Sequence, residues 1–333
     1  MGELRTGPVT VRFAVPAGID DPARPSGGNA YDRRVADLLG LRVVEVGGDL
    51  PRPARADDLE RVLRDVPDGD VVLLDGLVAC GVPEVVVPHS RRVRVVVLVH
   101  LPLADETGLP AAVAADLDAR ERRVLRAASA VVATGPGAAR GVAARHGLGH
   151  VHVAPPGVDP APASRGTDGA SRLLCVASLT PRKGHDVLLD ALAGNADAPW
   201  TCAFVGAGSL GHDLGDRVEL PGPLTGDALA AQYDRADLFV LASRAETYGM
   251  VVTEALARGV PVIASAVPDA LGDGGVLLPA GDAEAFTGAL RRWFADAGWR
   301  AELRGRALRR RAALSTWEET ADALAGVLAS LRP

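Results

Sequence analysis

The chain has 333 residues, of which 48% are hydrophobic, and this is enough for two ordinary domains with separate cores. Its net charge of −6 argues against nucleic acid as a partner, because binding to a phosphate backbone needs a basic surface. The three cysteines are widely spaced, and no apolar run approaches the roughly 20 residues that span a bilayer. We therefore expect a cytoplasmic protein with at most peripheral membrane contact.

The first half of the chain alternates short apolar runs with helical patterns. Each run has the length and composition of a strand that is buried on both faces of a parallel sheet. The runs are RFAVP (12–16), RVVEV (42–46), VVLLDG (71–76), VRVVVLVH (93–100), AVVATG (130–135) and VHVAPPG (151–157). They predict a doubly wound α/β domain over residues 1–160.

Two features of this half are candidates for ligand binding. Gly27 and Gly28 fall in a predicted loop between the first strand and a helix, where backbone could approach a diphosphate or an acceptor closely. His100 ends a predicted strand, and ligands in such sheets bind beyond the carboxyl ends of the strands. A histidine at a strand end is most often structural, so both interpretations of His100 stay open.

The second half repeats the alternation after a segment rich in Pro, Gly, Ser and Asp over residues 155–171, which predicts a linker. Its apolar runs are RLLCVAS (172–178), TCAFVG (201–206), RVELPG (217–222), ADLFVLAS (236–243), VPVIAS (260–265) and GVLLP (275–279). A second doubly wound domain is predicted over residues 161–315, with a cleft between the two domains.

Two motifs follow the first strands of this domain. Arg182 and Lys183 stand just before Gly184 and a helical pattern, and two cations at a helix start suggest an anion there. Gly206 and Gly208 open a formal dinucleotide fingerprint. Only a few residues separate this fingerprint from the next strand, too few for the helix and the ribose-binding acid of a dinucleotide-binding unit.

The segment from 243 to 265 contains two glutamates eight positions apart. Glu246 falls in the turn between a predicted strand and a helix that should begin near Tyr248. The free N–H groups of Gly249, Met250 and Val251 would then favour an anion such as phosphate.

Glu254 lies roughly 9 Å further along the axis of the same predicted helix. There it would accept hydrogen bonds from two vicinal hydroxyls, such as those of a ribose, and Glu246 could do the same for a sugar. With Tyr248-Gly249, Glu254-Ala255 and Gly259-x-Pro261 in register, the segment resembles the retaining, nucleotide-sugar-dependent glycosyltransferases of family 4.

The resemblance implies the GT-B fold, in which two doubly wound Rossmann-like domains face a central cleft. It also implies that the last helix, over about 316–333, packs back on the first domain. In this family Glu246 would contact the transferred sugar and Glu254 the nucleotide ribose. Lys183 matches the family lysine that neutralises the donor diphosphate, whereas Ser178 occupies the place of the family arginine.

Further site residues follow from the resemblance. Arg182 is expected to supply the charge missing at Ser178, and His100 to face the donor sugar. The family has glycine turns at the positions of Gly27-Gly28 and of Gly206-x-Gly208, which would approach the donor. No metal and no cofactor are expected, and the co-substrate would be a nucleotide-diphosphate sugar of the UDP or GDP type.

We therefore expect a retaining hexosyltransferase that acts on a small-molecule or lipid-linked acceptor. One alternative is a non-catalytic subunit that binds a nucleotide sugar, because the sequence departs from the family at Ser178 and after Ser265. An NAD-dependent dehydrogenase is a weaker alternative, based on the glycines alone. A glycoside hydrolase is weaker too, since its pair of carboxylates works without a phosphate site.

Overall fold

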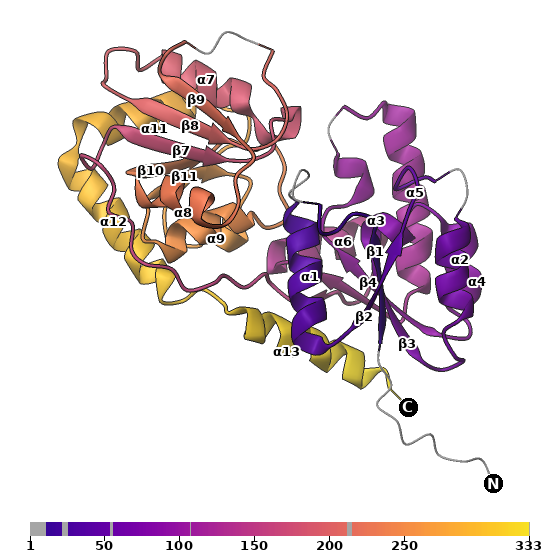
Figure 1. Ribbon diagram of the computed structural model, residues 1–333. Coiled ribbons are helices and arrows are strands. Elements are labelled where there is room, and N and C mark those ends of the chain that lie inside the picture. The colour runs from indigo at the N-terminus through magenta and orange to yellow at the C-terminus, as the bar shows by residue number, and fades with distance from the viewer. Residues whose placement is uncertain (1–10, 22–25, 54–55, 107, 212–214, 333) are drawn as a thin grey trace.

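The structure is a computed structural model that describes residues 11–21, 26–53, 56–106, 108–211 and 215–332. It contains two parallel six-stranded sheets, each flanked by helices (Figure 1). The first sheet has the order β2-β1-β3-β4-β5-β6. Its strands are β1 (Arg12–Pro16), β2 (Arg42–Val46), β3 (Val71–Asp75), β4 (Arg94–Val99), β5 (Ala130–Ala133) and β6 (His152–Val153).

Helices connect these parallel strands. They are α1 (Gly27–Leu39), α2 (Asp57–Arg64), α3 (Gly76–Ala79), α4 (Pro83–His89), the 3-10 turn η1 (Leu103–Asp105), α5 (Ala111–Ala127) and α6 (Pro136–His146).

The second sheet has the order β12-β11-β10-β7-β8-β9. Its strands are β7 (Arg172–Val176), β8 (Thr201–Val205), β9 (Val218–Gly222), β10 (Leu238–Leu241), β11 (Val262–Ser265) and β12 (Val276–Leu278). The helices that follow are η2 (Pro181–Lys183), α7 (His185–Ala193), α8 (Gly226–Asp234), α9 (Met250–Ala257), α10 (Pro268–Leu271), α11 (Ala283–Ala295), α12 (Ala297–Arg311) and α13 (Trp317–Ser330). None of the helices in the described ranges is long and apolar enough to cross a membrane.

Every apolar run that was predicted to be a strand contains one. The central strands β3, β4, β5, β10 and β11 are almost entirely buried, because helices cover both faces of each sheet. This burial explains why the runs are continuously apolar rather than alternating.

The strand order determines where a ligand can bind. In the second sheet the chain proceeds from β7 outward through β8 to β9, then returns to place β10 on the other side of β7. The crevice beyond the carboxyl ends of β7 and β10 is therefore the switch point, where open α/β sheets bind their ligands. The segments that contain Lys183 and Glu246 follow these two strands.

The two halves are joined twice. Residues 155–171 form neither helix nor strand, and α13 returns the chain to the first half, where it lies beside α1 (Figure 1). Thr316 and Glu319 form a capping box that begins α13. Trp317 then packs edge-on against Tyr31 of α1 with ring centroids 5.9 Å apart, and Thr320 donates a hydrogen bond to the Pro155 carbonyl (2.7 Å). The last helix thus belongs to the core of the first sheet.

Candidate functional site

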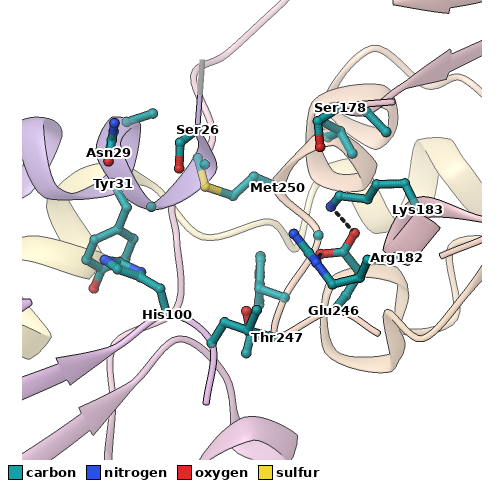
Figure 2. A pocket seen from close by; sticks show the side chains of 18 of the residues that line it. Ser26, Asn29, Tyr31, His100, Ser178, Arg182, Lys183, Glu246, Thr247 and Met250 are labelled. Atoms are coloured by element: carbon teal, nitrogen blue, oxygen red, sulfur yellow. Dashed lines mark hydrogen bonds and ion pairs between the residues drawn. The ribbon is translucent and has the colours of Figure 1, made fainter. Parts of the chain in front are cut away.

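A cavity of about 750 Å³ lies between the two sheets. Residues from both halves line it, and Figure 2 shows the two groups facing each other. Tyr31 and His100 come from the first half, whereas Ser178, Lys183 and Glu246 come from the second. All of these sit at or just beyond the carboxyl ends of strands, or at the start of α1.

The cationic part of the cavity is built from η2 and the turn after β10. Lys183 donates a hydrogen bond from Nζ to Oε1 of Glu246, and Ser243 donates to the same oxygen at 2.9 Å. The Arg182 guanidinium lies 3.6 Å from Oε2 of Glu246 and 3.6 Å from a carboxylate oxygen of Glu106 in the first half. The structure thus brings Arg182, Lys183 and Glu246 together, as the sequence predicts.

Lys183 is unusual in this chain for a simple reason. Of the 36 Lys and Arg residues, Lys183 is the single lysine. Everywhere else the protein uses arginine for positive charge, and a lysine ammonium differs from a guanidinium in being a compact point charge. The amino-acid composition alone therefore singles out Lys183, independently of any motif.

The helix expected near Tyr248 begins two residues later, at Met250. Gly249 adopts a left-handed conformation with φ of 96° and serves as the N-cap, so the chain cannot be helical there. A Cβ at Gly249 would also lie 2.5 Å from the Val267 side chain. Tyr248, Gly249, Met250 and Val251 nevertheless all line the cavity, which places the amino end of α9 against it.

Glu254 lines the same cavity one turn further along α9. Its Oε2 accepts a hydrogen bond from the Tyr233 hydroxyl at 2.8 Å. Burial raises the pKa of Glu254, while this hydrogen bond and the charge of Arg258 lower it. Tyr233 is fully buried on α8 and stacks on Phe239 with centroids 6.0 Å apart, so its hydroxyl is fixed in place. Nothing in the sequence pointed to Tyr233.

The glycine turn after β8 is tightly packed against the loop after β7. A Cβ at Gly206 would lie 1.9 Å from the Ala177 carbonyl oxygen, and Gly208, with φ of 116°, pairs with Leu179 in a parallel bridge. Gly206 and Ser178 line the cavity, whereas Gly208 lies beyond its lining. Close contact between the two backbone segments therefore explains why glycine occupies both positions. The proposed role of Gly206 and Gly208 in binding the donor stays a prediction.

Gly27 and Gly28 are not in a loop, as the sequence suggested, but form the first turn of α1. The N-cap Ser26 is extended, and the helix begins directly after it. A Cβ at Gly28 would lie 3.3 Å from the His100 ring, and one at Gly27 would lie 3.6 Å from the Met250 sulfur. Figure 2 shows Met250 extending from the second half toward Ser26. The start of α1 thus packs against His100 of its own half and against Met250 of the second half.

His100 follows β4 and lines the cavity, but its Nε2 is already engaged. It lies 2.7 Å from Oδ1 of Asp32 and 3.7 Å from Oδ2 of Asp75. Both carboxyl groups are buried, Asp32 on α1 and Asp75 at the end of β3, where Asp75 also accepts the Leu77 N–H at 2.5 Å. The sequence did not single out either aspartate, because only the sheet topology brings them to His100.

Burial raises the pKa of Asp32 and that of Asp75 to about 8 each, and it lowers the pKa of His100. Oδ2 of Asp32 is buried without a hydrogen-bond partner, and a hydrogen bond with the Asp75 carboxyl lowers the pKa of Asp32 in part. The ligand atoms of these three residues also lie within 4.8 Å of one another, a spacing that could hold a cation. The expectation that no metal takes part therefore stays a prediction.

Comparison with known proteins agrees with this geometry. Residues 170–296 match the family model described as glycosyl transferases group 1. A D-inositol 3-phosphate glycosyltransferase of Catenulispora acidiphila is 32% identical over 288 residues, which cover 75% of this chain and 67% of that protein. The corresponding protein of Mycolicibacterium gilvum is 34% identical over 204 residues, covering 53% of this chain and 46% of the relative.

Two solved structures share the architecture over nearly the whole chain. Sucrose-phosphate synthase from Thermosynechococcus elongatus superposes with a TM-score of 0.76 at 21% identity, covering 96% of this chain and 99% of that one. Anabaena HepE in complex with UDP and glucose gives a TM-score of 0.74 at 17% identity, with the same coverage of 96% and 99%.

The alignments with the first curated relatives span about half of those proteins' length or less, and the alignment with the Catenulispora protein spans two thirds. The predicted fold class is confirmed, since both sheets and their arrangement match the solved structures. The chain therefore belongs to the group 1 glycosyltransferases and has the GT-B fold.

Proposed function

We propose that the protein is a retaining glycosyltransferase of family 4 that transfers a hexosyl unit from a nucleotide-diphosphate sugar, of the UDP or GDP type, to an acceptor hydroxyl. One observation carries this proposal. At the switch point of the second sheet, a single cavity brings together a cation pair, two carboxylates and the amino end of a helix.

The diphosphate would lie between Lys183, Arg182 and the amino end of α9. Positive groups fixed at this place stabilise the negative charge that grows on the diphosphate as it departs, which is the main barrier of the reaction. Glu246 is held beside these cations by Ser243 and would accept hydrogen bonds from the hydroxyls of the sugar. Glu254, fixed by Tyr233, would accept hydrogen bonds from the ribose.

The proposed reaction needs no enzyme nucleophile. The bond between the anomeric carbon and the diphosphate oxygen breaks, and the acceptor oxygen bonds to the same face of that carbon. The acceptor proton passes to an oxygen of the departing diphosphate. The protein's part is to position both substrates and to stabilise charge.

The dehydrogenase alternative finds no support in the fold of the glycine turn. Between β8 and β9 the described residues, 206–211 and 215–217, form no helix. A dinucleotide-binding unit places the pyrophosphate at the amino end of a helix directly after such a turn. A non-catalytic subunit that binds a nucleotide sugar would have the same architecture as an enzyme. Only an assay of sugar transfer distinguishes the two.

The single lysine makes a direct test possible. Reductive methylation with ¹³C-formaldehyde labels Lys183 and the α-amino group, and Lys183→Gln identifies the lysine resonance in an NMR spectrum. We expect UDP or GDP to shift the Lys183 resonance, and Glu254→Ala to weaken that response. A response to NAD alone would support a dehydrogenase, and the absence of any nucleotide response would contradict the proposed donor site. Donor binding without transfer to any acceptor would indicate a binding subunit.

A further inference from the structure

The wall of the cavity that belongs to the first half is largely apolar. Six leucines line it, from the ends of β2, β3 and β4 and from the region of α5: Leu50, Leu77, Leu101, Leu103, Leu109 and Leu117. We refer to these six residues as the leucine wall. Leu103 and Leu117 are buried in the core beneath, while Leu50 and Leu109 pack on its edge.

Leu77 is the most informative member of the leucine wall. Leu77 lies in the first turn of α3, where its N–H donates a hydrogen bond to the Asp75 carboxyl. The residue is 41% exposed although it lines a cavity. The other large apolar residues that are exposed in the described part of the chain lie outside this cavity: Leu38, Leu220, Leu277 and Leu308. An exposed leucine inside a substrate cavity is covered when an apolar ligand binds, and this burial favours binding.

The charges of the described residues in the same wall disfavour an anion. Among the described residues of the first half that line the cavity, none is a lysine or an arginine. The titratable side chains of that group are Tyr31, Asp75, His100 and Glu106. Glu106 faces Arg182 across the cavity, and Nε2 of His100 lies 2.7 Å from the buried Asp32 carboxyl.

One element of the first half does favour an anion, namely the amino end of α1. It lies beside Met250, since a Cβ at Gly27 would be 3.6 Å from the Met250 sulfur. Met250 begins α9, so this helix end is adjacent to the proposed diphosphate site. An acceptor phosphate placed against the leucine wall would meet apolar groups and the Glu106 carboxylate, which is costly for a buried charge.

We propose that the leucine wall binds the hydrocarbon part of an uncharged acceptor, so that the acceptor is an alcohol or glycoside with an apolar body and not an inositol phosphate. This inference deepens the proposed function and depends on it. The acceptor hydroxyl would lie at the inner edge of the leucine wall, facing the transferred sugar. The hydrocarbon can belong to a small soluble alcohol or to a membrane lipid, and both share this chemistry.

The test compares three soluble probes by saturation-transfer NMR and calorimetry in the presence of the nucleotide that shifts the Lys183 resonance. The probes are octyl β-D-glucoside below its micelle concentration, methyl β-D-glucoside and inositol 3-phosphate. We expect the octyl compound to bind at least about tenfold more tightly than the methyl compound, because burial of even two of its additional methylene groups accounts for such a factor. Equal affinities for these two, or tightest binding of inositol 3-phosphate, would overturn the proposal.

A matched pair of variants localises the effect. Leu77→Ser should reduce the advantage of the octyl chain about threefold, whereas Leu38→Ser, at an equally exposed leucine outside the cavity, should keep it. An octyl advantage that both variants retain in full would contradict the role of the leucine wall. The Lys183 resonance reports nucleotide binding separately, so loss of donor binding is distinguished from loss of acceptor binding. Co-sedimentation with vesicles that contain a neutral glycolipid then separates a lipid acceptor from a soluble one.

Discussion

Lys183 and Glu246, which both come from the second half, are hydrogen-bonded to each other at one side of the cavity. One is the proposed ligand of the donor diphosphate, and the other is the proposed ligand of the transferred sugar. Each neutralises the charge of the other, and the Glu246 side chain is only 9% exposed. We therefore expect donor binding to divide this pair, with Lys183 contacting the phosphate and Glu246 accepting hydrogen bonds from the sugar hydroxyls.

The first prediction concerns Lys183. Lys183→Gln removes the point charge beside the diphosphate, and we expect it to lower kcat/KM at least about a hundredfold, because a positioned cation stabilises the departing group. Steady-state kinetics with the donor would measure this. Arg306→Gln is the control, since Arg306 lies on α12 outside the cavity lining and forms its ion pair with Glu302 one turn away. A similar loss in both variants would contradict a specific role for Lys183.

The second prediction concerns the support of Glu254. Tyr233→Phe removes the hydroxyl that donates to Glu254 and keeps the ring that stacks on Phe239. Since this hydrogen bond lowers the pKa of Glu254, its loss should raise that pKa further. A protonated carboxyl is a poorer acceptor for ribose hydroxyls, so we expect nucleotide binding to weaken several-fold, and more at pH 6 than at pH 8. Calorimetry at both pH values decides this, and unchanged binding at pH 6 would contradict it.

The third prediction concerns Asp32 and Asp75. Burial raises the pKa of each carboxyl from its ordinary 3.8 to about 8, so the folded protein binds protons here that the unfolded chain has already released. The stability contributed by the protonated form is complete below pH 4 and is lost as the pH rises toward 8. We therefore expect the free energy of unfolding to contain a component that falls over this range.

Urea unfolding at several pH values would measure that component. Asp32→Asn keeps the shape of the side chain and removes one titrating group, so the fall with pH should become smaller. Asp227→Asn, at an exposed position on α8, should leave the pH profile as it is in the unaltered protein. A profile for Asp32→Asn identical to that of the unaltered protein would count against the buried carboxyl pair.

The fourth prediction concerns Gly157, in the connection between the halves. A Cβ there would lie 2.2 Å from the Trp317 backbone nitrogen, at the start of α13. We expect Gly157→Ala to destabilise the protein by about 1–3 kcal/mol, because backbone cannot yield as a side chain can. Gly149→Ala is the matched control, since nothing lies within 4 Å of a Cβ at that position. Chemical denaturation of both variants measures the difference.

The strands could be predicted from the sequence because buried parallel strands require continuous apolar runs, and local composition records this directly. The position of Glu246 and Lys183 at the cavity could be predicted because each lies a few residues beyond such a run, in a motif of known spacing. The starts of α1 and α9 were each misplaced, since a helix boundary depends on single backbone angles such as the positive φ of Gly249.

Asp32, Asp75 and Tyr233 could not be predicted from any local pattern. Asp32 has the spacing of an ordinary polar residue in an amphipathic helix, and only packing of α1 against the sheet turns it inward toward His100. Tyr233 lies 21 residues before Glu254, and the contact depends on how α8 and α9 pack. Leu77 is also inconspicuous in the sequence, because a leucine after a strand normally belongs to the core.

The return of α13 to the first sheet has a mechanical consequence. The two connections between the halves run side by side, since the Val158 amide donates a hydrogen bond to the Ser315 carbonyl at 3.0 Å. Two adjacent connections allow the halves to rotate about the axis that passes through both connections. They restrict rotation of the halves about other axes. We therefore expect the halves to open and close along one arc, so that each closure would return the proposed sugar-binding groups of the second sheet to the same place opposite His100.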